Sequence, residues 1–183
     1  MRDRGIAVFG SSEPGPGDPL FEQATQIGRL LAQAGHAVVT GGYGGVMEGA
    51  SRGACEGGGR AIGVTCSIFA ERAPNPYLTE EICTGDLAQR TGELVDRSRG
   101  FVVLEGKAGT LAELSFLWAL QRAGCLDARP VIVLSARFKA LFERLAGESI
   151  LDPQQVRMTR VADSADDVLR ILSRALQSEE PER

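Results

Sequence analysis

The sequence has very few of the residues that most often carry catalysis or bind metals. Its 183 residues include one histidine, His36, and four cysteines, and no two cysteines have the spacing C-x-x-C. Zinc-type ligand spacing is therefore absent. A Ser-His-Asp triad could be built only around His36, which lies at an expected helix-to-strand turn. We expect no metal site and no resident cofactor.

Long apolar runs and a surplus of positive charge are also missing. The formal net charge is −4 and the isoelectric point is about 5.2, which disfavours binding to nucleic acid through bulk charge. No apolar run has the length that spans a membrane, and residues 6–9 are too short for the core of a signal peptide. We therefore expect a cytoplasmic protein with reduced thiols and with neither a nucleic-acid nor a membrane partner.

Apolar residues make up 43% of the chain and charged residues 24%, which is typical of a globular domain. The length and the absence of a linker predict one domain over residues 1–178, followed by a frayed charged tail over residues 179–183. Strand-like and helix-like patterns alternate along it. Strands are expected at residues 5–9, 36–40, 60–65, 100–104, 129–134 and 156–161, and helices at residues 20–34, 46–56, 85–98, 110–123, 138–147 and 164–177.

This alternation predicts a single-domain α/β fold, a Rossmann-like doubly wound parallel sheet with helices on both faces. Ligands of such sheets bind at the carboxyl ends of the strands. Three short stretches follow expected strands: GSS at residues 10–12, GGYGG at 41–45 and EGKAGT at 105–110. GGYGG is the strongest signal, because four glycines in five residues cost backbone entropy and supply little packing. Neither the dinucleotide fingerprint nor a P-loop is present, which disfavours an NAD enzyme or a triphosphatase.

The stretch EGKAGT allows two interpretations, a structural cap of the next helix or a phosphate-binding site. Thr110 and Glu113 have the spacing T-x-x-E of a capping box, in which they would satisfy the first N–H groups of the next helix. Alternatively, those N–H groups and the positive end of the helix dipole bind a phosphate. The two readings compete for the same donors, and a bound phosphate would leave Glu113 free to face the ligand.

Four stretches taken together resemble the LOG (LONELY GUY) family. They are IAVFGSS, IGRLLAQAGHAVVTGG, GGVMEGASRGACEGGG and VLEGKAGTLAEL, which occur in this order within residues 6–134. The family motif PGGxGTxxE is matched in its second half by Gly109, Thr110 and Glu113, whereas the first half reads EGK. The family's arginine in the preceding helix is matched by Arg90, but the lysine that normally follows it is replaced by Thr91.

The resemblance implies a dimeric nucleotide-binding protein that hydrolyses the N-glycosidic bond of a nucleoside 5′-monophosphate such as AMP or a cytokinin nucleotide. It assigns catalysis to Arg90 and Glu113, with the carboxylate opposing the positive charge that develops on the ribose. A nucleoside monophosphate or a related phosphate-bearing molecule is then the expected partner. The residues implied for binding it are Gly10, Ser11, Ser12, Gly41, Gly42, Gly44, Gly45, Met47, Gly106, Lys107, Ala108, Gly109 and Thr110.

The departures from the motif support an alternative, a non-catalytic carrier or sensor of a nucleotide-like phosphate ligand such as a molybdenum cofactor. Lys107 replaces a glycine where backbone must approach phosphate. It either adds a positive charge to the phosphate site or points outward beside Glu105. Proteins of the LOG family were long mislabelled as lysine decarboxylases. We reject that activity for this sequence, because nothing marks Lys107 as a cofactor-linked lysine.

Two further expectations concern surfaces. The helix at residues 111–123 carries Phe116, Leu117, Trp118 and Leu120, more apolar surface than one stripe onto a sheet requires. This surface is either a homodimer interface or simply buried in its own domain. The segment 66–84 has no clear periodicity and is a candidate lid, in which Asn75 and Tyr77 are the expected ligand contacts.

Overall fold

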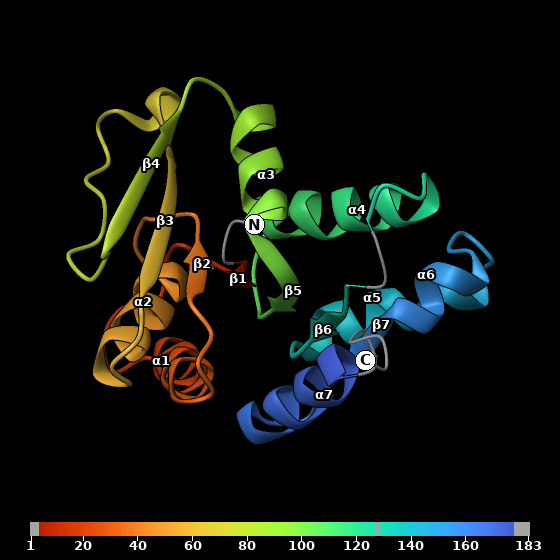
Figure 1. Ribbon diagram of the computed structural model, residues 1–183. Coiled ribbons are helices and arrows are strands. Elements are labelled where there is room, and N and C mark those ends of the chain that lie inside the picture. The colour runs from red at the N-terminus through yellow and green to blue at the C-terminus, as the bar shows by residue number, and fades with distance from the viewer. Residues whose placement is uncertain (1–3, 127–128, 178–183) are drawn as a thin grey trace, which may run out of the picture.

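A parallel sheet of seven strands organises the computed structural model, which describes residues 4–126 and 129–177 (Figure 1). The strand order is β4-β3-β2-β1-β5-β6-β7, and every neighbouring pair is parallel. The central strands are buried on both faces, which explains why their sequences read as continuous apolar runs. The strands are β1 (Gly5–Phe9), β2 (Val38–Thr40), β3 (Ala61–Cys66), β4 (Glu80–Thr84), β5 (Ser98–Val103), β6 (Val131–Val133) and β7 (Thr159–Val161).

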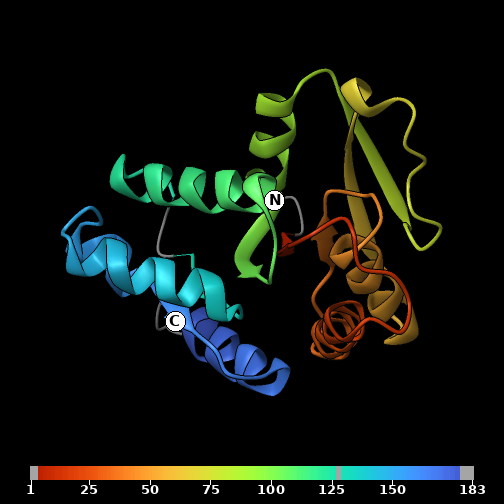
Figure 2. The same ribbon diagram turned by 180° about the vertical axis from the view of Figure 1, so that it is seen from behind.

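Helices cover both faces of the sheet (Figures 1 and 2). One apolar core joins the sheet to α1, α2 and α7, and a second core on the opposite face joins it to α3, α4, α5 and α6. No helix within the described ranges is both long and apolar enough to cross a membrane. The helices are α1 (Pro19–Gln33), α2 (Val46–Glu56), α3 (Leu87–Asp96), α4 (Ala108–Arg122), α5 (Ala136–Gly147), α6 (Pro153–Met158) and α7 (Ala165–Gln177), with a 3-10 turn, η1, at Ser67–Phe69.

The predicted doubly wound sheet is confirmed, with two elements added. Strand β4 was not predicted, because its sequence EEICT has no apolar run; as an edge strand it pairs only with β3 and leaves both glutamates exposed. Helix α6 was not predicted either. It begins after a capping box between Asp152 and Gln155, so the strand expected at residues 156–161 shortens to β7. The predicted charged tail lies outside the described residues.

The order of the strands reverses between β1 and β5. The chain moves outward from β1 to β4, crosses back to β5 on the other side of β1, and continues to β7. The segments that follow β1 and β5 are joined where they leave the sheet, since the amide of Ser11 donates to the carbonyl of Glu105 over 2.9 Å. Such a reversal places a crevice at the carboxyl ends of the strands, where doubly wound proteins bind ligands.

Helices α1 and α2 are in backbone contact through two glycines. A Cβ atom added at Gly28 would lie 2.0 Å from the carbonyl oxygen of Ala50, and one added at Gly53 would lie 1.9 Å from that of Thr25. Because no larger residue fits at either position, the small residues of α2 are explained by helix packing. The contact also fixes the relative positions of the loops that precede the two helices.

Candidate active site

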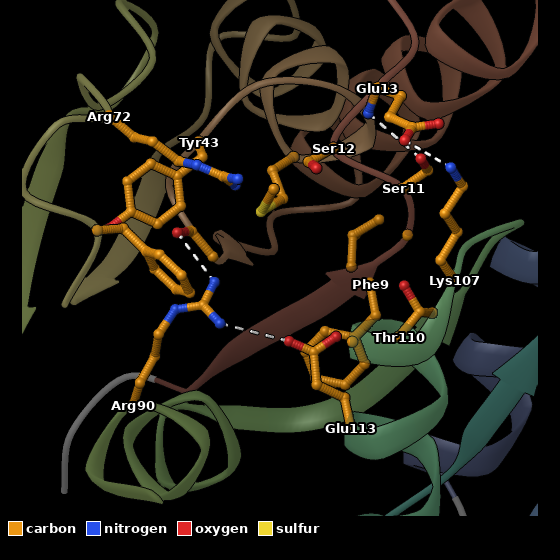
Figure 3. Close-up of a pocket in the computed structure, with 16 residues that line it drawn as sticks. Phe9, Ser11, Ser12, Glu13, Tyr43, Arg72, Arg90, Lys107, Thr110 and Glu113 are labelled. Carbon is orange, nitrogen blue, oxygen red and sulfur yellow. Dashed lines mark hydrogen bonds and ion pairs between the residues drawn. The ribbon is translucent and has the colours of Figure 1, made fainter. Parts of the chain in front are cut away.

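A pocket opens at the strand-order reversal, between the loops that follow β1, β2 and β5 and the segment after β3 (Figure 3). The segment after β3 contributes two residues and α3 contributes one. The pocket is therefore formed by parts of the chain that are more than a hundred residues apart in the sequence. Its lining consists of Val8, Phe9, Gly10, Ser11, Ser12, Glu13, Gly41, Tyr43, Met47, Phe69, Arg72, Arg90, Lys107, Gly109, Thr110 and Glu113.

Most of the predicted site residues meet at this pocket. Both predicted catalytic residues line it, and so do eight of the predicted binding residues: Gly10, Ser11, Ser12, Gly41, Met47, Lys107, Gly109 and Thr110. The other five do not line it, and they are Gly42, Gly44, Gly45, Gly106 and Ala108. Among these five, Gly42 and Gly45 have positive φ angles of 80° and 76°, so they turn the chain behind the pocket wall.

Helix α4 begins at the pocket without a side-chain cap. Its N-cap residue is Lys107, whose side chain accepts no hydrogen bond from the first turn. The capping box, one of the two interpretations of EGKAGT, is therefore wrong: Thr110 is a buried residue inside the first turn, and Glu113 lies one turn into the helix. The first N–H groups of α4 remain available to a ligand. Most of the other helices have a side-chain cap: Asp18 at α1, Asp86 at α3, Ser135 at α5, the capping box of Asp152 and Gln155 at α6, and Ser164 at α7.

Lys107 extends across the mouth of the pocket to the loop after β1. Its Nζ lies 2.5 Å from Oε1 of Glu13, and both side chains are more than 60% exposed. Glu105 is not its partner, contrary to one of the two expectations, because Glu105 lies 3.0 Å from Arg137 Nε and accepts a hydrogen bond from the hydroxyl of Ser135. Glu13 was missed because it stands in a loop rich in proline and glycine that has no periodicity.

Arg90 projects from α3 into the pocket and is held by backbone. Its Nε donates to the carbonyl of Val64 over 2.8 Å, and its Nη2 donates to the carbonyl of Gly41 over 3.1 Å. A Cβ atom at position 41 would lie 1.8 Å from Nη2, so the arginine can pass only because this residue is glycine. The guanidinium also lies over the ring of Tyr43, 5.9 Å from its centre.

Glu113 approaches Arg90 from the opposite side of the pocket (Figure 3). Its Oε1 lies 3.7 Å from Nη1 of Arg90, and the two side chains are 16% and 11% exposed. Burial raises the pKa of Glu113 to about 7, although the nearby guanidinium acts in the opposite direction. Near neutral pH this carboxyl group is therefore close to its titration midpoint, a property common among groups that exchange charge during catalysis.

Asn75 holds the glycine-rich loop rather than a ligand. This buried residue donates from its backbone to the carbonyl of Gly42 over 2.8 Å and from Nδ2 to the carbonyl of Tyr43 over 3.1 Å. Its Oδ1 accepts from the amide of Tyr77. Neither Asn75 nor Tyr77 lines the pocket, so the expectation that they are its ligand contacts is wrong. The Tyr43 hydroxyl is fixed as well, since it donates to the carbonyl of Cys66 and accepts from the amide of the same residue.

Two residues of the segment after β3 complete one wall of the pocket. The ring of Phe69 meets Tyr43 edge-on, with centroids 5.8 Å apart and an angle of 88° between the planes. Arg72 places its Cζ 5.2 Å from the centre of the Phe69 ring. No sequence pattern indicates Phe69 or Arg72, because this segment is irregular. A large Tyr43 among four glycines, by contrast, is a visible signal.

The apolar surface of α4 is divided between the core and the exterior. Leu117 and Trp118 are buried, and Trp118 Nε1 donates to the hydroxyl of Thr159. Leu111 and Phe116 are 36% and 39% exposed. The exposed pair leaves an apolar face on α4, so the predicted dimer interface stays a prediction. No cluster of three or more His, Cys, Asp or Glu side chains that could hold a metal occurs in residues 4–126 and 129–177.

The fold and the pocket define a doubly wound α/β protein with a ligand site at the reversal of strand order. Comparison with known proteins gives the family. The sequence profile of the SLOG cluster4 family matches residues 3–163, and the chain belongs to this family. The resemblance to LOG proteins is thereby confirmed.

Two relatives match over nearly the whole chain. The probable cytokinin riboside 5′-monophosphate phosphoribohydrolase LOGL5 of Oryza sativa subsp. japonica is 30% identical over 92% of this chain and 71% of its own length. The cytokinin riboside 5′-monophosphate phosphoribohydrolase of Mycobacterium tuberculosis is 29% identical over 90% of this chain and 91% of its own.

Solved structures match the fold. The molybdenum cofactor binding protein from the phototrophic bacterium Rippkaea orientalis has a TM-score of 0.76 and is 26% identical, over 96% of this chain and 99% of its own. The molybdenum cofactor carrier protein of Chlamydomonas reinhardtii has a TM-score of 0.74 and is 24% identical, over 95% and 99% of the two chains. This second likeness concerns the fold alone.

Proposed function

We propose that this protein is a LOG-like phosphoribohydrolase, which hydrolyses the N-glycosidic bond of a nucleoside 5′-monophosphate such as AMP or a cytokinin nucleotide. The products are the free base and ribose 5-phosphate. The observation that carries the proposal is the Arg90–Glu113 pair, which is largely buried in the pocket and lies beside the uncapped start of α4. The names of the relatives from rice and Mycobacterium tuberculosis support the same reaction.

The start of α4 is the proposed phosphate site. Gly109 and Thr110 line the pocket within the first turn, where free N–H groups and the positive end of the helix dipole favour an anion. Lys107 is close enough to exchange its partner Glu13 for the phosphate. Fixing the phosphate here positions the ribose over Glu113, one helical turn further on.

Glu113 is proposed to stabilise the transition state. As the bond between C1′ and the base nitrogen breaks, positive charge develops on the ribose, and an ionised carboxylate nearby lowers the energy of that state. The oxygen of a water molecule then bonds to C1′. One proton of that water is transferred to the base nitrogen that was bonded to C1′, and the neutral base leaves. Arg90, fixed by two backbone carbonyls, presents Nη1 to the ligand and orients the ribose or the leaving base.

A hydrolysis assay tests the proposal. Purified wild-type protein is incubated with AMP and with a cytokinin riboside 5′-monophosphate, and the free base is quantified by chromatography. Glu113→Gln keeps the shape of the side chain and removes its charge, so base release is expected to fall at least a hundredfold. Glu143→Gln on the exposed face of α5 is the matched control and is expected to retain full activity. Equal activity of the wild type and Glu113→Gln would overturn the proposal.

A second candidate is a non-catalytic carrier of a nucleotide-like phosphate ligand. The observation in its favour is the altered loop, in which Lys107 and Glu105 replace the expected glycine and proline and form ion pairs with Glu13 and Arg137. The likeness to the molybdenum cofactor binding protein of Rippkaea orientalis supports the same idea. Saturable nucleotide binding without base release in the assay above would favour this candidate over the enzyme.

We further propose that the protein acts as a cytoplasmic homodimer. The exposed side chains of Leu111 and Phe116 on α4 supply an apolar surface for a second copy. Helix α4 also carries the proposed catalytic residue Glu113, so an interface at this surface would stiffen the site. The free cysteines Cys55, Cys66, Cys83 and Cys125 agree with a reducing compartment.

A further inference from the structure

One wall of the pocket offers hydrogen-bond donors and aromatic surface but almost no acceptor. We call the side chains of Tyr43, Met47, Phe69 and Arg72 the aromatic wall. The Tyr43 hydroxyl is already paired with the backbone of Cys66 through both a donated and an accepted bond. The remaining polar side chain of the wall is the Arg72 guanidinium, which can only donate.

Arg72 is an exposed residue that lines the pocket, and its guanidinium has no polar side-chain partner in the described part of the chain. Its guanidinium contacts the Phe69 ring, and Phe69 in turn meets the Tyr43 ring at 88°. Since the hydroxyl of Tyr43 is fixed at the end of β3, the two rings form a firm support beneath the guanidinium. Figure 3 shows the Arg72 side chain extending over Tyr43 toward the interior of the pocket.

The side chains that line the pocket are arranged in the same order as the phosphate, the ribose and the base of a nucleotide. Lys107 and Thr110 lie on one side, Arg72 and Tyr43 lie on the opposite side, and Glu113 lies between them (Figure 3). A nucleoside monophosphate with its phosphate at α4 and its ribose at Glu113 therefore directs its base to the aromatic wall. The far edge of a purine would meet Arg72.

We propose that Arg72 determines base specificity and selects 6-oxopurine nucleoside 5′-monophosphates, IMP and GMP, over AMP; this rests on the proposed function. Hypoxanthine and guanine present two adjacent acceptors, O6 and N7, which match the two parallel N–H groups of an arginine. Adenine presents N7 beside an amino group, so one donor of Arg72 would face another donor. Sequence patterns of the family cannot indicate this residue, because Arg72 stands outside every glycine-rich motif.

The test compares IMP with AMP, which carry an oxo and an amino group on C6 and differ also in the proton on N1. Wild-type protein is expected to show a kcat/KM about tenfold higher for IMP than for AMP, the size of one bidentate base contact. Arg72→Ala is expected to lower the value for IMP about tenfold while changing that for AMP less than twofold. Arg72→Lys keeps the positive charge but lacks the paired donors, and it is expected to lose the preference as well. Arg157→Ala, at an exposed position of α6, is the matched control and is expected to keep it.

Binding measurements separate this proposal from the proposed reaction. Calorimetry of IMP, GMP and AMP with Glu113→Gln reports base recognition without turnover. A preference for IMP and GMP that disappears in the double variant with Arg72→Ala supports the role of Arg72, even if the wild type releases no base. AMP binding as tight as IMP binding would overturn the proposal. The proposal would also be overturned if Arg72→Ala weakened the binding of all three nucleotides equally, or if the wild type bound no nucleotide.

Discussion

Nη1 of Arg90 lies 3.7 Å from Oε1 of Glu113, and the two residues come from different helices on the same face of the sheet. The guanidinium is close enough to favour the ionised carboxylate, yet burial outweighs this effect and leaves the pKa of Glu113 at about 7. The pair is therefore poised to respond to small changes in pH or in its surroundings.

The rate of base release is expected to rise with pH through about 7. Stabilising a positively charged ribose requires the ionised form of Glu113, and that form becomes dominant only above its raised pKa. Replacing Arg90 with methionine removes the group that lowers this pKa, so the midpoint of the profile is expected to move to higher pH in addition to a loss of rate. Measurements of kcat/KM between pH 5 and 9 check both. A wild-type profile that is flat between pH 6 and 8 would count against the ionised-carboxylate mechanism.

Stability is expected to change with pH for the same reason. Between about 4.5 and about 7 the carboxyl of Glu113 is ionised in the unfolded chain but still protonated in the folded protein. The folded state then binds more protons, so the free energy of unfolding falls as pH rises through this window. Glu113→Gln is expected to flatten that fall, as urea unfolding at pH 4.5, 6 and 7.5 would reveal. If the free energy of unfolding depended on pH in the same way in the wild type and in Glu113→Gln, the dependence would belong to other titratable groups.

Removing the charge of Glu13 is expected to tighten phosphate binding. In the free protein the Lys107 ammonium is paired with Glu13, and an incoming phosphate must compete for it. Exposed pairs of this kind are worth only up to about 1 kcal/mol, so Glu13→Gln is expected to lower the Kd for AMP by no more than about fivefold. Lys107→Ala is expected to raise the Kd, with a weaker dependence on salt. The decisive result, in a titration at low ionic strength, is a Kd for AMP that falls in Glu13→Gln and rises in Lys107→Ala.

Asn75 is expected to act through the glycine-rich loop. Its Nδ2 holds the carbonyl of Tyr43, and Asn75→Ala leaves that carbonyl and the Ser51 hydroxyl without this donor in a buried place. We expect a loss of about 1–3 kcal/mol in unfolding free energy. Both a higher KM and a lower kcat are expected, because the loop forms part of the pocket and its Gly41 carbonyl holds the proposed catalytic residue Arg90. Asn75→Asp, which keeps the shape and lacks the donor, separates the hydrogen bond from packing.

A charge on the outer face of α4 is expected to dissociate the proposed dimer. Phe116 is 39% exposed in the single chain, and Phe116→Glu would bury a carboxylate in an interface formed there. Sedimentation velocity at several concentrations compares it with Ile150→Glu, which changes an apolar residue that is 60% exposed elsewhere. A dimeric Phe116→Glu or a monomeric wild type would contradict the proposed interface.

Much of the fold follows from local sequence. The buried central strands are continuous apolar runs, and the glycine clusters lie at strand ends, so periodicity and turn chemistry place both. Strand β4 shows where this fails, because its pairing depends on β3 and not on its own apolar content. The capping box at Thr110 failed for a different reason. A four-residue pattern cannot reveal where a helix begins, and here α4 begins two residues earlier.

The site could be predicted where it rests on glycine motifs and on residues matched to a family. Arg90 and Glu113 meet the predicted loops in one pocket. Glu13, Phe69 and Arg72 could not be found in this way, because each lies in an irregular segment and reaches the pocket only through tertiary contacts. Asn75 was given the wrong role for the same reason.

The backbone contact between α1 and α2 has a consequence for how this pocket changes in evolution. Since Gly28 and Gly53 hold the two helices at a fixed spacing, the loops before them cannot move apart without loss of that packing. The part of the ligand site that these two loops form is therefore expected to keep the same geometry. The segment after β3 and the turn before α4 take no part in this contact between the two helices, so substitutions of their exposed side chains can change ligand choice without disturbing it. Divergence in substrate among relatives is expected to concentrate in those two segments.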